Sequence, residues 1–241
     1  MKARTTALLT CCAALAGPAA ADAAVSEIGT FAAAQQPSCP AKPCYVLNQT
    51  TAFQAKEGTN RSVVVAPADG RVVAWTVRLA KMTTKQTQFF DTNLGGPASA
   101  QLTIVRPGPK LSFRILAQGE PQLLEPYFGQ TVQFPLAATI PVKKGNVVAL
   151  TATTWAPVLA LGQPPTTSWR ASRQAGACDP PNPDTAQTRV NNIRRFACLY
   201  QGVRLTYSAT FVPDPVPNAG SKSTTVKNPS TSGTTTKPKA G

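Results

Sequence analysis

The chain has 241 residues, with 24 Lys and Arg, 10 Asp and Glu, 23 Pro and no His. The absence of His excludes Ser-His-Asp and Cys-His nucleophile systems, a His general base and His-ligated metal sites. Charged residues make up 14% of the chain, well below the usual quarter, and Pro occurs at about twice its average frequency. This composition disfavours a helical bundle and favours an all-β, turn-rich protein of one domain or two small ones.

The N-terminal residues have the features of a secretory signal peptide. Lys2 and Arg4 precede a short apolar run at 7–17, and Ala21-Asp22-Ala23 offers a small-residue cleavage site. The apolar run is too short to span a hydrocarbon layer of about 30 Å. We therefore predict a signal peptide at 1–24, a secreted or envelope-associated protein, and no transmembrane span.

Removal of the signal peptide leaves four cysteines, which predict two disulfides. An even number of cysteines in an oxidising compartment favours disulfide bonds, and four cysteines allow three pairings. We expect the local pairs Cys39–Cys44 and Cys178–Cys198. A zinc site with four thiolate ligands is the alternative, but these spacings differ from those of zinc knuckles.

Residues 25–44 show no strong period and are expected to form an N-terminal arm. From residue 45 onward, apolar residues alternate in short segments bounded by Pro and Gly, which is typical of β-strands. Residues 62–66 and 71–79 flank a Pro-Ala-Asp-Gly turn, which predicts two strands joined by a tight connection. The apolar residues expected to face a core in these and later strands are Val73, Trp75, Val77, Leu79, Leu102, Ile104, Leu111, Phe113, Ile115, Val148, Leu150, Ala152, Leu205, Tyr207, Ala209 and Phe211.

The regular spacing of these strands predicts an antiparallel two-sheet β-sandwich, jelly-roll-like in topology, over residues 45–212. No window of 11 or more residues after the signal peptide holds a helical period. Long connections are expected at 81–99, 120–130, 156–165 and 175–195, and loops on a rigid sandwich are where binding residues concentrate. Residues 213–241 are rich in Pro, Thr, Ser and Lys and cannot bury enough apolar surface to fold, so we expect a disordered tail.

The charge balance points to anionic partners. The formal net charge is +14, and because residues 1–24 contain Lys2, Arg4 and Asp22, the remainder carries +13. A basic extracellular protein is expected to associate with polyanions such as acidic wall polymers. The basic residues are dispersed, however, and the densest group is Arg189, Arg194 and Arg195 within the Cys178–Cys198 loop.

Aromatic residues near the long connections suggest a carbohydrate-binding platform. Trp155 and Trp169 lie on either side of the 156–165 loop, and Tyr127 belongs to a Pro-Tyr-Phe-Gly loop. Exposed rings of this kind could stack against sugars, and core packing is the alternative. The candidate ligand-binding residues are therefore Trp155, Trp169, Arg189, Arg194, Arg195 and Tyr127.

Catalytic and metal-binding patterns are weak. Glu120 and Glu125 share one loop and are close together in the sequence, although sequence proximity does not establish the separation that glycoside hydrolysis requires. Asp179 and Asp184 loosely suggest calcium ligands, but the EF-hand spacing is missing. We expect no catalytic residue, no metal site and no cofactor.

Two segments resemble a known group of proteins. VVVAPADGRVVAWTVR and ATIPVKKGNVVALTA resemble secreted β-sandwich proteins of actinobacteria with no established activity, over about residues 62–152, and the Arg-Leu-x-Tyr strand at 204–207 also fits. The resemblance implies a sandwich fold and export, and it implies no functional residue. Asn146 stands where that group usually has Asp, and the cysteine-bounded insert at 174–198 also departs from its simpler members.

These observations favour an exported, non-catalytic protein that binds an anionic or carbohydrate polymer of the cell envelope. A secreted hydrolase using paired carboxylates is one alternative. A protein-interaction module of a secreted assembly, which would expose an apolar patch of several hundred Å², is another. No specific nucleic-acid partner is expected, and the sequence leaves the oligomeric state open.

Overall fold

The computed structural model describes residues 24–40, 43–178 and 189–215. Nearly all of the predicted signal peptide and most of the predicted tail lie outside these residues. The calcium-ligand candidates Asp179 and Asp184 lie outside them as well.

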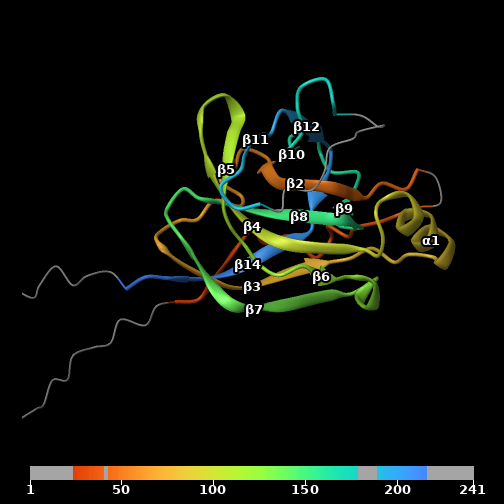
Figure 1. Cartoon of the computed structure of the whole chain (residues 1–241), viewed down its shortest axis with the longest axis horizontal. Helices are drawn as coiled ribbons and strands as arrows, with labels where there is room; N and C mark the ends of the chain where they lie inside the picture. The colour runs from red at the N-terminus through yellow and green to blue at the C-terminus, as the bar shows by residue number, and fades with distance from the viewer. Residues whose placement is uncertain (1–23, 41–42, 179–188, 216–241) are drawn as a thin grey trace, which may run out of the picture.

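The chain folds into antiparallel β-sheets that pack together (Figure 1). The smaller sheet has four strands in the order β1 (Ser26–Ile28), β14 (Tyr207–Pro213), β3 (Gly70–Arg78) and β7 (Thr131–Val142). The larger sheet runs in the order β11 (Ile193–Arg195), β5 (Ser112–Gln118), β4 (Ser99–Pro107), β8 (Val147–Ala156), β2 (Leu47–Lys56), β10 (Ser168–Ala171) and β12 (Cys198–Gln201). The β-sandwich that the sequence predicts is confirmed.

The remaining elements are short. β6 (Gln122–Leu123) pairs with β4, while β9 (Leu159–Ala160) and β13 (Arg204–Leu205) pair with each other. The helices are α1 (Thr84–Asn93), η1 (Pro109–Leu111) and η2 (Glu125–Tyr127). No helix within the described ranges is long and apolar enough to cross a membrane.

The larger sheet curls until one segment reaches both of its edges. β11 pairs with β5 at one edge and β12 pairs with β10 at the other, yet only Phe196 and Ala197 separate β11 from β12. The rings of Phe53, Phe113 and Phe196 meet with centroid distances of 5.0, 5.4 and 4.7 Å, although β2 and β5 are not neighbours in the sheet. These aromatic contacts therefore fill the space that the curl encloses.

A row of buried hydroxyls crosses the centre of the larger sheet. The hydroxyl of Thr151 on β8 lies 2.7 Å from that of Thr51 on β2 and 2.7 Å from that of Thr103 on β4. Just after the neighbouring strand β10, Ser172 Oγ lies 3.0 Å from Thr50 Oγ1 and accepts a hydrogen bond from the amide of Thr51. Because each buried hydroxyl has a partner, polar residues are tolerated inside this sheet.

The predicted core residues are mostly buried, with two local shifts. On β3, Trp75 and Val77 are buried as expected, but Val72 is buried in place of Val73 because the pairing register shifts between Val72 and Ala74. Such a β-bulge adds one residue and reverses the alternation beyond it. Leu111 is exposed because it ends the turn η1 instead of beginning β5.

Two secondary-structure expectations are wrong. Residues 62–66 do not form a strand, since only Val65 makes an isolated bridge, to Val147. The segment 81–99 is not a plain loop, because it contains α1. Thr83 caps this helix by accepting from the Gln86 amide, and the Gln86 side chain accepts from the Thr83 amide. This capping box stabilises a helix that is too short and too polar to show an apolar period.

The two segments that carry the family resemblance meet at one end of the smaller sheet. Asp69 accepts hydrogen bonds from the Lys144 amide at 2.9 Å and from Lys143 Nζ at 2.9 Å. The amide and then the ammonium group hold the pKa of Asp69 below its usual range. Gly70 is required beside it, because a Cβ there would lie 2.4 Å from the Val212 carbonyl oxygen. The contact between the turn at Asp69 and the turn at Lys143 and Lys144 therefore fixes how β3 and β7 pair.

Arg204 has no exposed surface and joins three parts of the chain. Its Nη2 donates to the carbonyl oxygens of Gly29 at 2.7 Å and Thr30 at 3.1 Å. Nη1 donates to Gln54 Oε1 at 3.5 Å, and Nε donates to Glu57 Oε2 at 3.3 Å. Burial lowers the pKa of Arg204, while the carboxylate of Glu57 acts in the opposite direction. The guanidinium is therefore buried with an acceptor for each nitrogen.

Replacement of Arg204 tests this network. We expect Arg204→Met to lower the free energy of unfolding by about 3 kcal/mol, because two buried carbonyl oxygens and Glu57 lose their donor. Urea denaturation of the purified, disulfide-bonded protein measures the change. The exposed Arg61 provides the control: Arg61→Met is expected to stay within about 0.5 kcal/mol of the wild type. Equal midpoints for the two variants would contradict a stabilising role for Arg204.

Candidate functional site

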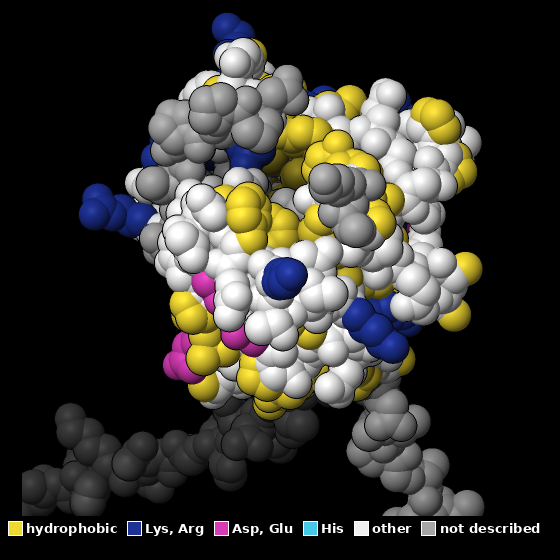
Figure 2. Space-filling model, turned by 90° about the vertical axis from the view of Figure 1, so that its right-hand side faces the viewer, with side chains coloured by type: hydrophobic (Ala, Val, Ile, Leu, Met, Phe, Trp, Pro, Cys, Tyr) yellow, Lys and Arg dark blue, Asp and Glu magenta, His cyan; other side chains and the backbone are white. Residues whose placement is uncertain are grey.

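A cavity of about 560 Å³ lies beside the β10–β12 edge of the larger sheet, and we call it the Trp169 pocket. Its volume is in the range of small-molecule binding sites, about 300–1,000 Å³. Figure 2 shows apolar side chains gathered around a hollow in the upper part of this end of the molecule. The residues that line the pocket are Tyr45, Val46, Asn48, Leu159, Leu161, Trp169, Arg173, Cys178, Leu199, Tyr200, Gln201 and Val203.

Two stacked aromatic rings form part of the pocket wall. Trp169 on β10 lies opposite Tyr200 on β12, and their ring centroids are 4.3 Å apart with an interplanar angle of 18°. On its other side in the sheet, Trp169 lies opposite Gln54 of β2. Trp169 is only 6% exposed, and the pairing of β10 with β2 and with β12 fixes its position. This wall is preformed.

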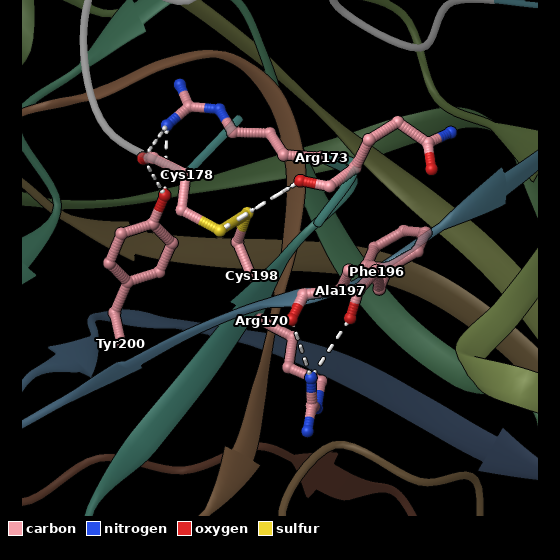
Figure 3. The surroundings of a disulfide bond; sticks show 8 residues. Arg170, Arg173, Cys178, Phe196, Ala197, Cys198 and Tyr200 are labelled. Atoms are coloured by element: carbon pink, nitrogen blue, oxygen red, sulfur yellow. Dashed lines mark hydrogen bonds between the residues drawn. A yellow bond between two sulfur atoms is a disulfide. The ribbon is translucent and has the colours of Figure 1, made fainter. Parts of the chain in front are cut away.

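Arg173 is the charged residue of the pocket and is only 7% exposed. Its Nη2 donates to Asn48 Oδ1 at 2.7 Å, and its Nη1 donates to Tyr200 Oη at 3.1 Å. The Tyr200 hydroxyl in turn donates to the Cys178 carbonyl oxygen at 2.6 Å. Figure 3 shows Arg173 and Tyr200 directed at the same carbonyl, whereas Arg170 points away toward the carbonyls of Phe196 and Ala197.

Two buried donors in this wall have no acceptor. Among the described residues, Trp169 Nε1 and Arg173 Nε are the buried side-chain polar atoms without a hydrogen-bond partner. An unsatisfied buried donor costs about 1–3 kcal/mol, and folded proteins contain few of them. Both atoms belong to side chains that line one pocket, but the two nitrogens themselves are buried behind its surface.

The charge of Arg173 has no ion-pair partner among the described residues. Within the described part of the chain, the ion pairs are Lys143–Asp69 and Arg204–Glu57, and neither includes Arg173. The lining residues contain one cation and no carboxylate. Arg173 is instead surrounded by neutral acceptors, which fix the guanidinium without neutralising it. Among the described lining residues, Arg173 therefore supplies the formal charge of the pocket wall.

The four cysteines form the two disulfides that the sequence predicts. Cys39 pairs with Cys44, and Cys178 pairs with Cys198. No thiolate of these four remains for zinc, so the zinc alternative is wrong. Among the described residues, no group of three Cys, Asp or Glu side chains is placed to hold a metal ion. Cys198 begins β12 and Cys178 lines the pocket, so the second disulfide ties the pocket to the sheet edge.

The prediction that Trp155 belongs to an exposed platform is wrong. Trp155 is 0% exposed, and its Nε1 donates to Asp91 Oδ1 at 3.0 Å and to the Gly96 carbonyl oxygen at 3.1 Å. Its ring packs against Phe90 of α1 and against Phe128. The indole therefore attaches the short helix to β8, and this is the core role that was the alternative.

The other candidate binding residues do not converge on the pocket. Tyr127 is half-buried in η2 and packs edge-on against Phe134 at 5.5 Å. Arg194 and Arg195 are exposed on β11, and Arg189 is exposed shortly before them. Among the sequence-based candidates, the structure places only Trp169 in the pocket wall.

The carboxylate candidates have different surroundings. Glu125 Oε1 accepts a hydrogen bond from the Ala98 amide at 3.1 Å. Glu120 is exposed and borders a small cavity whose other lining residues are Gln122, Pro135, Leu136 and Ala137. No second acid lines that cavity, so the arrangement offers no support for paired-carboxylate chemistry.

Sequence reasoning missed most of the pocket. Arg173, Tyr200 and Tyr45 are far apart in the chain, and none stands in a recognisable motif. A usable signal was the pair of aromatics at Trp169 and Tyr200, each in a short strand next to a cysteine-bounded segment. Their pairing depends on which strands are neighbours, which a single sequence does not reveal.

No protein-family model matches the chain, and comparisons with curated proteins and with solved structures found no match either. The fold and the pocket define an all-β protein with a preformed aromatic cavity that contains one buried cation. What this cavity does must therefore be inferred from its own residues.

The two disulfides are expected to differ in their contributions to stability. Loop-closure entropy predicts a loss of about 3 kcal/mol for Cys178→Ser/Cys198→Ser and about 2 kcal/mol for Cys39→Ser/Cys44→Ser. The larger value follows from the longer loop, with sequence separations of 20 and 5 residues. Denaturant unfolding of both double variants checks the order. A greater loss for the Cys39–Cys44 pair would contradict the expectation.

Proposed function

We propose that this protein is an exported, non-catalytic binding protein of the cell envelope and that the Trp169 pocket is its ligand site. The observation that carries the proposal is a cavity of about 560 Å³ whose wall combines apolar side chains, the stacked rings of Trp169 and Tyr200, and Arg173. A wall of this kind is suited to holding one group of a larger ligand.

The overall charge supports an envelope polymer as the carrier of that group. After the predicted signal peptide, the chain carries a formal charge of +13. Figure 2 shows Lys and Arg side chains scattered over the visible face instead of gathered in one patch. Scattered positive charge attracts a polyanion without fixing which of its repeating units lies at a given place on the surface. The pocket would then supply the specific contact, while the surface charge raises the local polymer concentration.

Export is supported by two features. The chain begins with a signal-peptide pattern, and the two disulfides are compatible with an oxidising compartment. The resemblance to secreted actinobacterial sandwich proteins agrees with this assignment.

Retention on envelope material tests the proposal. The purified protein is incubated with the insoluble cell-envelope fraction of the producing organism at low ionic strength and then at rising salt. We expect retention at low salt and progressive release as salt screens the charges. Tyr45 and Leu199 are exposed lining residues of the pocket. We expect Tyr45→Ala/Leu199→Ser to lower retention about fivefold, since tyrosines are enriched among the few contact residues whose truncation costs more than about 1 kcal/mol.

Phe89→Ala is the matched control, because Phe89 is an equally exposed aromatic on α1 that does not line the pocket. It should be retained like the wild type. Absence of retention at low ionic strength would end the envelope proposal. Equal losses of retention for Phe89→Ala and for Tyr45→Ala/Leu199→Ser would contradict a role of the pocket in this binding.

A further inference from the structure

The connection between β4 and β5 is a tight hairpin that projects from the upper left of the body in Figure 1. The Gly108 amide donates to the Ser112 carbonyl oxygen at 2.7 Å and closes the turn. Lys110 and Leu111 have φ of 54° and 59°, in the left-handed region. Hairpin turns with two such residues favour Asn and Gly at these positions. The Leu111 side chain is nevertheless 40% exposed, so the hairpin presents a lysine and a leucine on a strained backbone.

Three adjacent strands place cations on one side of this hairpin. Arg106 on β4 lies directly opposite Arg114 on β5, and Arg114 lies directly opposite Ile193 on β11. Arg195 lies opposite Ser112, two residues from Arg114, so it projects to the same side. Arg106, Ile193 and Arg195 are all exposed. We call the group of Arg106, Lys110, Leu111, Arg114, Ile193 and Arg195 the hairpin face.

No acidic residue belongs to β4, β5 or β11. Within the described ranges, no ion pair includes Arg106, Arg114 or Arg195. The Arg114 guanidinium donates to a neutral acceptor, the Asn191 carbonyl oxygen, at 3.1 Å. Arg194 alternates to the other side of β11, and Arg189 directly follows residues outside the described ranges, so neither is counted in the hairpin face.

The nearest acid along β5 does not reverse this charge. Leu116, two residues after Arg114 and on the same side of the strand, lines a cavity of about 260 Å³. Asp214 lines the same cavity, but so do Arg71 and Lys143. The described surroundings of the hairpin face are therefore also positive.

Protection of the sheet edge explains only part of this arrangement. β11 is the edge strand, and charged side chains on an edge prevent pairing with another chain, which accounts for Arg195. β4 and β5 lie inside the sheet, where one arginine directly opposite another is unfavourable. Edge protection also gives no reason to expose Leu111 and Ile193. The combination therefore points to a partner outside the chain.

A lipid surface matches both parts of the hairpin face. A soluble polyanion would neutralise the arginines but leave Leu111 and Ile193 in water. An anionic bilayer offers phosphate groups next to an apolar layer, so it takes up cations and apolar side chains together. Pro107 and Pro109 flank the tip of the hairpin and lack an N–H, so they add apolar surface without a donor to desolvate.

We propose that the hairpin face docks this protein on an anionic lipid surface. Leu111 and Ile193 enter the interface, while the four cations contact phosphate headgroups. Association of this kind is peripheral and reversible, because it combines two apolar side chains with charges that salt screens. The inference goes beyond the proposed function, because it does not involve the Trp169 pocket.

Sedimentation with lipid vesicles tests the proposal. The vesicles contain either equal parts of phosphatidylglycerol and phosphatidylcholine or phosphatidylcholine alone. The disulfide-bonded protein is prepared without the predicted signal peptide at 1–24, whose apolar run would itself bind lipid. At low ionic strength we expect the anionic vesicles to bind the protein at least about tenfold more tightly than the neutral ones. Rising salt should release it.

Variants of the hairpin face separate charge from apolar contact. Arg106→Gln/Arg195→Gln should weaken binding to the anionic vesicles about twentyfold. Leu111→Asn should weaken it about threefold. Because Asn tolerates positive φ better than Leu, this variant should be at least as stable as the wild type, so unfolding would not explain its loss.

The matched control for the arginine variant is Arg61→Gln/Lys85→Gln, which removes the same charge from exposed sites elsewhere. It should lose less than about twofold, since the lost charges lie away from the docking surface. The basic residues of the 213–241 segment are present in every variant, so they contribute equally to each measurement.

The outcomes are distinct. Equal binding to both kinds of vesicle, binding to neither, or equal losses for the two double variants would overturn the proposal. Soluble polyphosphate identifies the other class of partner: binding to it as tight as to anionic vesicles at equal phosphate concentration, and unchanged in Leu111→Asn, would also overturn it. The pocket variant Tyr45→Ala/Leu199→Ser should bind vesicles like the wild type. A protein that envelope material retains but vesicles do not bind would contradict the lipid proposal alone.

Discussion

The guanidinium of Arg204 can be buried only if two distant segments of the chain supply its acceptors at once. Gly29 and Thr30 do so from the N-terminal segment, and Gln54 and Glu57 from the end of β2. Because an unpaired buried cation costs several kcal/mol, these segments must assemble together. Gln54 extends the network by donating to the carbonyl oxygens of Ser168 and Val203, and by accepting from the amide of Leu205. The backbone behind the Trp169 pocket is therefore fixed by the same charge.

The second constraint is the curl of the larger sheet. A flat sheet of these strands would leave the β5 and β10 edges open, and open edges invite further strand pairing. The segment from Ile193 to Gln201 pairs with both, so the curl protects them within one chain. The disulfide at Cys198 lies where this segment passes from one edge to the other. Tyr200 follows two residues later, which places the stacked wall of the pocket next to the covalent link.

Sequence reasoning recovered what depends on local pattern and missed what depends on pairing. The alternation around Trp75 and Tyr207 predicted strands, and both residues are buried in the core. The shift from Val73 to Val72 was not predictable, because a bulge is set by the partner strands. Trp155 was placed at the surface because it adjoins the predicted loop at 156–165, yet the capped helix α1 covers it. Arg173 had no local signal, since its partners Asn48 and Tyr200 are 125 and 27 residues away.

The two buried arginines differ in how completely the fold supplies hydrogen-bond acceptors for their guanidinium groups. Arg204 is paired with a carboxylate and has an acceptor at every nitrogen, so its burial is satisfied within the fold. Arg173 is nearly as buried, but its described partners are neutral and its Nε is unpaired. Folding alone does not require such an arrangement, because an apolar residue at this position would avoid the cost. In the described part of the chain, the fold therefore satisfies one buried guanidinium completely and leaves a nitrogen of the other without a partner, at the sheet edge that carries the pocket.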